Sequence, residues 1–177
     1  MADYQSLGIK KSLIPGIALT ASNYVLCGGV ALFLEKGTLQ YPEAKDLKLV
    51  VIGLAVYFFL VFAFIFRQGL GLNLLNPQLV TSEDPVVQGH IKNLYRTALN
   101  TLEQAPGFLI SLLVYAGLVN ARRGGILCLA YCAFLAPYPG LFGTGGKMSI
   151  NVFASTMPRY YIVTYMIVAP VLAALRT

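Results

Sequence analysis

The chain has 177 residues, of which 57% are hydrophobic and 11% charged, and its formal net charge is +6. Its length suits one domain, and its apolar composition excludes an ordinary soluble globule and predicts an integral membrane protein. Because the basic residues are spread over short polar segments, we interpret the positive charge as contact with lipid headgroups and expect no nucleic acid partner.

Five apolar stretches predict an all-α protein. They cover residues 12–34, 49–66, 86–119, 124–136 and 160–175. The second stretch is uncharged and rich in aromatic residues, so it is the strongest prediction of a membrane-spanning helix. The first follows a polar lead of residues 1–11 and is only moderately apolar. A spanning helix and a helix lying on the membrane surface both remain open for it.

The segments between these stretches are predicted as connections. Residues 68–88 form a long predicted loop, and residues 148–158 form a short link. The last apolar stretch is short for a span. Arg159 and Arg176 at its ends are expected to extend it by reaching toward the two membrane surfaces.

Three cysteines, Cys27, Cys128 and Cys132, all lie in apolar stretches. Cys128 and Cys132 are four residues apart, which would place both thiols on one face of a helix. They form no C-x-x-C motif and have no histidine cluster nearby. We therefore expect buried packing residues and no metal site.

Glu103 is unusual among the seven acidic residues because a long uncharged stretch, residues 104–121, follows it. An ionisable group in such a place needs a partner or a function. On a helix, Asn93, Arg96, Asn100 and Glu103 share one face, because their spacings are three, four and three. Arg96 can pair with a carboxylate and Glu103 with an ammonium group, so this stripe predicts a site for a small charged ligand. A polar contact between packed helices is the alternative.

The motif Arg96-x3-Asn100-x2-Glu103-x2-Pro106-x-Phe108-Leu109 resembles the signature of the MAPEG family, the membrane-associated proteins of eicosanoid and glutathione metabolism. The likeness is to the microsomal glutathione transferase branch and covers about residues 84–118. It implies a four-helix membrane subunit, usually a homotrimer, that binds glutathione as co-substrate between neighbouring subunits. Arg96, Asn100 and Glu103, with Asn93 on the same stripe, would then bind the substrate.

The resemblance also divides the chain. Residues 48–177 would form the MAPEG-like bundle of four transmembrane helices. Residues 1–47 would add a polar lead, an additional N-terminal hydrophobic helix and a connector. The fold class that we expect is therefore an integral membrane helical bundle with four family-type helices plus one.

Catalytic members of the family hold the glutathione thiolate with an arginine and tyrosines at the end of the helix after the signature helix. Tyr131 fits the first tyrosine, but Leu135 stands where a second is expected, and no arginine occurs between Arg123 and Arg159. Arg159, on the following helix, could replace the missing arginine, and a role as membrane anchor is the alternative. His90, the only histidine, is either a base at the mouth of the site or a helix cap or surface residue.

Two functions follow from these residues. One is a glutathione-dependent transferase or peroxidase of MAPEG type that acts on lipophilic electrophiles. The other is a non-catalytic MAPEG-like accessory subunit of a larger respiratory or photosynthetic membrane complex, attached through residues 12–34. Both imply a multi-pass protein among membrane lipids, in the endoplasmic reticulum or an organelle membrane. The sequence does not decide between them, so it leaves open whether the chain is an enzyme.

Overall fold

The computed structural model describes residues 2–39, 41–74, 81–143 and 150–177, with backbone only for residues 2–17 and 73–74. Within these ranges the chain is all helical, as the sequence predicts. The elements are α1 (Ala2–Leu34), a short 3₁₀-helix η1 (Ala44–Leu47), α2 (Lys48–Gly69), a π-helical turn η2 (Leu70–Leu74), α3 (Pro85–Leu118), α4 (Ala121–Leu135), α5 (Tyr138–Phe142) and α6 (Val152–Ala174).

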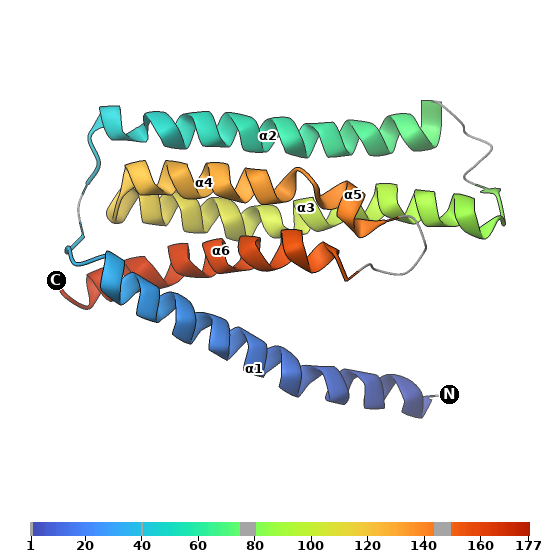
Figure 1. Ribbon diagram of the computed structural model, residues 1–177, viewed down its shortest axis with the longest axis horizontal. Helices are drawn as coiled ribbons and strands as arrows, with labels where there is room; N and C mark the ends of the chain where they lie inside the picture. The colour runs from blue at the N-terminus through green and yellow to red at the C-terminus, as the bar shows by residue number, and fades with distance from the viewer. Residues whose placement is uncertain (1, 40, 75–80, 144–149) are drawn as a thin grey trace.

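Four elongated helices, α2, α3, α4 and α6, run alongside one another and form the body of the molecule (Figure 1). Helix α1 lies outside this bundle. Its C-terminal part packs against α6, and its N-terminal part diverges from α6 (Figure 1). Near the crossing, the Asn23 amide donates to the Thr164 hydroxyl at 2.9 Å, and the Cys27 thiol donates to the Tyr161 carbonyl at 3.4 Å.

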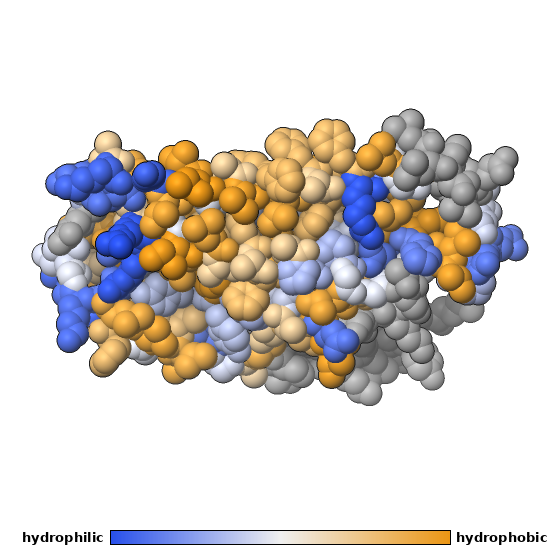
Figure 2. All heavy atoms as spheres, turned by 45° about the horizontal axis from the view of Figure 1, so that its top comes forward, coloured by the Kyte–Doolittle hydropathy of each residue, from blue (hydrophilic) through white to orange (hydrophobic). Residues whose placement is uncertain are grey.

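Among the described residues, three helical segments are long and apolar enough to cross a membrane. They are Ala44–Leu72, Pro85–Leu118 and Val152–Ala174. In the view of Figure 2, hydrophobic residues form a broad band across the middle of the molecule, and hydrophilic residues gather toward its ends. This pattern is typical of a membrane protein, because the apolar band matches the hydrocarbon layer and the polar ends match the headgroups.

The start of α3 and the end of α4 lie within one residue of their predicted places, whereas α4 starts at Ala121, three residues before the predicted 124. Helix α3 begins at Pro85, where the Asp84 carboxylate accepts from the Val86 backbone N–H at 2.8 Å. Helix α4 ends at Leu135, before the prolines that follow it. Both boundaries follow from local chemistry, a side-chain cap at the start and residues without an N–H at the end.

Three further predicted boundaries are wrong. The polar lead is already helical from Ala2, and the predicted loop of residues 68–88 is helical as far as Leu74. Residues 75–80 of that loop lie outside the described part of the chain. The link of residues 148–158 is helical from Val152, because Pro158 is accommodated inside α6. The last correction matters most, since it moves Arg159 from the start of a helix to its third turn.

Helices α2 and α4 approach closely through small residues. A Cβ atom added to Gly53 would lie 2.8 Å from the Cys128 sulfur, and one added to Gly125 would lie 2.5 Å from the Leu49 carbonyl carbon. All three cysteines are buried and free, as predicted. Among the described residues, no cluster of three or more His, Cys, Asp or Glu side chains could hold a metal. Cys128 and Cys132 therefore serve as small packing groups in this contact, and Cys27 does so between α1 and α6.

We expect Gly125→Ala to destabilise the protein by about 1–3 kcal/mol, because the added methyl group overlaps backbone atoms of α2 that cannot move independently. Gly107→Ala is the matched control, since a Cβ at Gly107 meets no atom within 4 Å and alanine favours helix. Thermal unfolding of both variants in mild detergent tests this. Equal unfolding midpoints would contradict the close helix contact.

Candidate functional site

Arg159 on α6 is the largest fully buried side chain of the described residues, with 1% of its surface exposed. It points into the bundle, and its hydrogen bonds go to neutral oxygens. Its Nε donates to the Ser155 carbonyl at 3.1 Å, and its Nη1 donates to the Gln104 side-chain oxygen of α3 at 3.0 Å. The expectation that Arg159 anchors the helix at the membrane surface is therefore wrong. The early start of α6 turns this side chain inward.

Aromatic rings from two other elements surround the guanidinium group. Its central carbon lies 4.9 Å from the ring centroid of Tyr138 on α5 and 5.7 Å from that of Tyr131 on α4. Both distances suit cation–π contact. Tyr131 also donates from its hydroxyl to the Gln104 side-chain oxygen at 3.4 Å. Arginine, glutamine and the two tyrosines thus form one polar cluster, which we call the Arg159 cluster.

The aromatic core lies next to this cluster. The ring of Phe108 stacks on Tyr131 with centroids 3.9 Å apart and packs against Tyr57 at 4.7 Å. The hydroxyl of Tyr57 is buried and has no hydrogen-bond partner among the described residues. An unpaired buried donor is uncommon in folded proteins, so this hydroxyl is available to a bound group or a water molecule.

No carboxylate pairs with Arg159 among the described residues. The ion pairs among the described residues are Lys45 with Glu43 and Arg123 with Glu35, and both lie far from the Arg159 cluster. A buried cation without a counterion is costly, and neutral oxygens and ring faces compensate only part of that cost. The arrangement favours an anionic ligand such as a carboxylate or thiolate.

The structure divides the predicted stripe of α3. Asn93 is 1% exposed and accepts from Nη2 of Arg67 at 2.8 Å, while its amide donates to the Pro139 and Gly143 carbonyls at 2.8 and 2.7 Å. Asn100 is half-buried and donates to the Tyr138 hydroxyl of the Arg159 cluster. The two asparagines thus hold α5 against α3.

Arg96 and Glu103, the other two members of the stripe, are exposed on the surface of the single chain. Because a helix turns about 100° per residue, both fall on the flank of the face that carries the buried Asn93 and the half-buried Gln104. His90 is also exposed, and Asp84 rather than His90 caps the helix. Of the four predicted ligand contacts, Asn93 and Asn100 therefore face the bundle, and the other two, Arg96 and Glu103, face outward.

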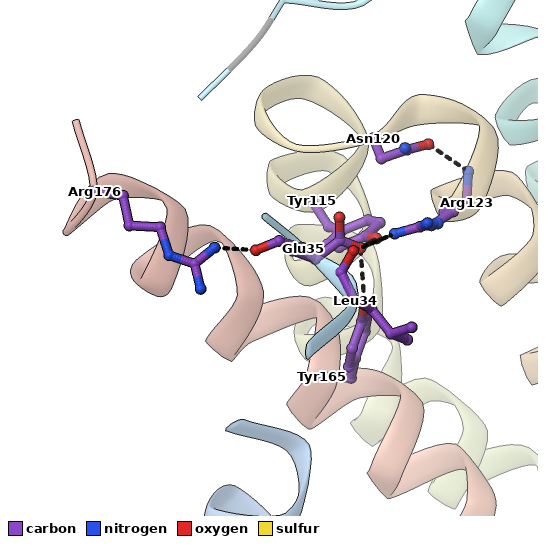
Figure 3. A network of polar contacts seen from close by, with 7 residues as sticks. All are labelled: Leu34, Glu35, Tyr115, Asn120, Arg123, Tyr165 and Arg176. Atoms are coloured by element: carbon purple, nitrogen blue, oxygen red, sulfur yellow. Dashed lines mark hydrogen bonds and ion pairs between the residues drawn. The ribbon is translucent and has the colours of Figure 1, made fainter. Parts of the chain in front are cut away.

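Among the described residues the buried carboxylate is Glu35, which the sequence analysis missed. Glu35 follows α1 and is 6% exposed. Its Oε1 accepts from the hydroxyls of Tyr115 and Tyr165, the latter at 2.8 Å, and from Nη1 of Arg123 at 2.9 Å. Arg176 donates to its backbone oxygen. Figure 3 shows these four side chains, from α3, α4, α6 and the C-terminal segment, converging on one residue. We call this group the Glu35 cluster.

The Glu35 cluster determines the protonation of its carboxylate. Burial raises the pKa of Glu35, but the hydrogen bonds from Tyr115, Tyr165 and Arg123 outweigh burial. The pKa therefore lies below its ordinary value of 4.5, and the side chain is charged at neutral pH. A charged Glu35 joins the end of α1 to three helices of the bundle.

The two polar clusters lie toward opposite ends of the bundle, because Glu35 is near the end of α6 and Arg159 is near its start. Comparison of the chain with protein-family models, curated proteins and solved structures finds no match.

Proposed function

We propose that this protein is a MAPEG-like, glutathione-dependent transferase or peroxidase that acts on lipophilic electrophiles. The observation that carries the proposal is the buried Arg159, which has no carboxylate partner among the described residues. It lies beside Gln104 and, through Tyr138, is connected to Asn100 of the helix that resembles the family signature. The cation that the chemistry requires is thus next to the signature helix.

The Arg159 cluster would lower the pKa of the glutathione thiol from about 8.5, because a nearby cation and hydroxyl donors stabilise the thiolate. In a transferase reaction the thiolate attacks an electrophilic carbon, a carbon–sulfur bond forms, and the leaving group departs with its electron pair. In a peroxidase reaction one glutathione thiolate attacks an oxygen of the hydroperoxide, the O–O bond breaks and the alcohol leaves. A second glutathione then attacks the sulfur of the resulting sulfenic acid, which forms the disulfide and releases water. Tyr138, whose hydroxyl accepts from Asn100, would donate to the thiolate, and Tyr131 would do so in place of its hydrogen bond to Gln104.

The outer pair Arg96 and Glu103 would complete the site in a homotrimer. Both are exposed on the single chain, where a neighbouring subunit could cover them. Arg96 would bind a carboxylate of glutathione and Glu103 its ammonium group. In this arrangement α2, α3, α4 and α6 are the four family-type transmembrane helices, and α1 is the additional N-terminal one.

Arg96→Ala should weaken glutathione binding by about 3 kcal/mol, because an ion pair covered by a second subunit leaves one charge unpaired when its partner is removed. Lys92→Ala is the matched control on the same exposed side of α3, and we expect it to change the binding much less. Calorimetric titration of both variants in detergent gives the comparison. Equal losses would remove Arg96 from the site.

The function itself is tested on the unmutated protein. We expect calorimetric binding of glutathione, conjugation of a chlorodinitroarene and reduction of a lipid hydroperoxide, with the products identified by mass spectrometry. Binding without either reaction would support a glutathione site but not the enzyme. Absence of binding would reject the enzyme and favour an accessory subunit.

One feature of the structure favours that alternative, a non-catalytic subunit of a larger respiratory or photosynthetic complex. The N-terminal part of α1 extends away from the bundle, where it could contact another protein (Figure 1). Removal of residues 1–17 keeps the contacts of Asn23, Cys27 and Glu35 with the bundle. If α1 is an attachment, this truncation should release the protein from copurifying subunits in native mass spectrometry. If the protein is a trimer of itself, the truncation should leave the trimer intact.

A further inference from the structure

A groove of about 230 Å³ lies between α1 and α4 beside the Glu35 cluster. Its walls are apolar, with Val30 and Leu34 from α1 and Ile126 and Leu127 from α4. Side chains of the Glu35 cluster, including Arg123, complete the lining. The groove exists because α1 packs against α6, which leaves apolar side chains of α1 and α4 facing a shared space.

Arg123 is the charged group of this groove, and it retains unused donors. Its side chain is 45% exposed. Nη1 donates to Oε1 of Glu35 at 2.9 Å and to the Leu34 carbonyl at 3.2 Å, and these are its only side-chain hydrogen bonds to the described residues. Nη2 and Nε are therefore available to a further acceptor. Glu35 does not repel that acceptor strongly, because two tyrosines and Arg123 already share its charge.

The groove lies toward the end of the bundle where, in a spanning protein, the helices reach the membrane surface. Helix α1 ends at Leu34, α4 begins at Ala121 and α6 ends at Ala174, all at this end of the molecule. Other cations lie here as well, among them Lys36, Arg122 and Arg176. A molecule that fits must be apolar toward the bundle and anionic at the surface, which describes a lipid with a negatively charged headgroup.

The geometry points to a binding site for one anionic phospholipid, with an acyl chain in the groove between α1 and α4 and the headgroup phosphate accepting hydrogen bonds from Arg123. This inference is independent of the Arg159 cluster and of glutathione. It predicts selectivity for the headgroup, and it predicts that α1 and α4 are joined through a lipid where they do not pack directly.

The test uses the full chain in mild detergent, with phosphatidylglycerol and phosphatidylcholine of identical acyl chains as probes and native mass spectrometry as the readout. We expect the protein to retain phosphatidylglycerol in preference to phosphatidylcholine. Arg123→Gln and Ile126→Trp should each lower retention about tenfold, the first by removing a charged donor and the second by filling the groove.

Two matched controls make the same kinds of substitution outside the groove. Arg122→Gln removes the neighbouring charge, which lines a different pocket with Tyr41 and Asp46. Ile110→Trp enlarges an exposed isoleucine of α3 that does not line the groove. Both should retain phosphatidylglycerol like the unmutated protein.

Several results would overturn the inference. They are equal retention of the two lipids, equal losses in Arg122→Gln and Arg123→Gln, unchanged retention in Ile126→Trp, and full displacement of the lipid by inorganic phosphate. Because Arg123→Gln also disturbs Glu35, circular dichroism must show that this variant is folded. Ile126 makes no hydrogen bond in the Glu35 cluster, so Ile126→Trp leaves that network in place and decides the question if Arg123→Gln unfolds.

Discussion

Arg159→Met should lower the rate of glutathione conjugation about 100-fold while leaving the stability of the protein nearly unchanged. The rate falls because the cation that stabilises the thiolate is lost, an effect of the size seen when one preorganised donor is removed. The stability changes little because a buried cation without a counterion contributes little to folding. After the substitution, the Gln104 oxygen still accepts from the Tyr131 hydroxyl.

The pH dependence of the reaction separates a catalytic role of Arg159 from a structural one. In the unmutated protein the rate should reach its plateau well below the ordinary thiol pKa of about 8.5. In Arg159→Met the plateau should move toward that value, since the thiol is no longer stabilised as thiolate. Arg159→Lys should recover part of the rate, because it restores a charge but not the planar guanidinium.

A purely structural role of Arg159 predicts the opposite changes in stability and in pH profile. If Arg159 only holds α6 to α3, Arg159→Met should lower the unfolding midpoint, and the pH profile of the remaining activity should not move. Arg122→Met is the control for loss of a positive charge, since Arg122 is exposed on α4 and far from the cluster.

Sequence periodicity predicts the helices of this protein better than their ends. Helix α3 is predicted almost to the residue, because Asp84 and Pro85 define its start by local chemistry. Helix α6 is predicted to start too late, because Pro158 resembles a boundary. In the structure its missing N–H lies in the second turn of a longer helix, where the packed bundle tolerates it.

The error over Arg159 follows from that boundary. At the end of an apolar stretch an arginine is expected to reach toward water, whereas inside a helix it takes the direction that the helix imposes. The spacing of Ser155 and Arg159, four residues apart, was the available signal, since it places both on one face. Gln104, which accepts from Arg159, could not be identified from its own surroundings in the sequence.

The two acidic residues show why composition alone is a weak guide to burial. Glu103 is followed by an uncharged stretch and is exposed on the chain, whereas Glu35 lies next to a charged connector and is buried. The partners of Glu35 come from positions 80 to 141 residues away in the sequence. Local patterns carry no information about such contacts, so only the fold could reveal them.

Glu35→Ala should destabilise the protein by about 3–5 kcal/mol, the cost of removing one member of a buried charged network. It leaves Tyr115, which is fully buried, without the acceptor of its hydroxyl and leaves Arg123 without its counterion. It also releases the end of α1 from the bundle. Glu35→Gln keeps the shape and an acceptor oxygen, so we expect a smaller loss of about 1–2 kcal/mol.

The same residue should make stability depend on pH. The pKa of Glu35 is lowered in the folded protein, so its contribution is complete above the unfolded value near 4.5 and is lost as the pH falls through the lower folded value. The unmutated protein should therefore lose stability relative to Glu35→Gln as the pH is lowered below about 5.

Glu43→Gln is the matched control, because Glu43 is an exposed carboxylate paired with Lys45 at 2.7 Å, and such pairs contribute about 0–1 kcal/mol. Thermal unfolding in detergent at several pH values measures all three proteins. If Glu43→Gln and Glu35→Gln respond alike, or if the acid-side loss persists unchanged in Glu35→Gln, the buried carboxylate does not hold α1 to the bundle.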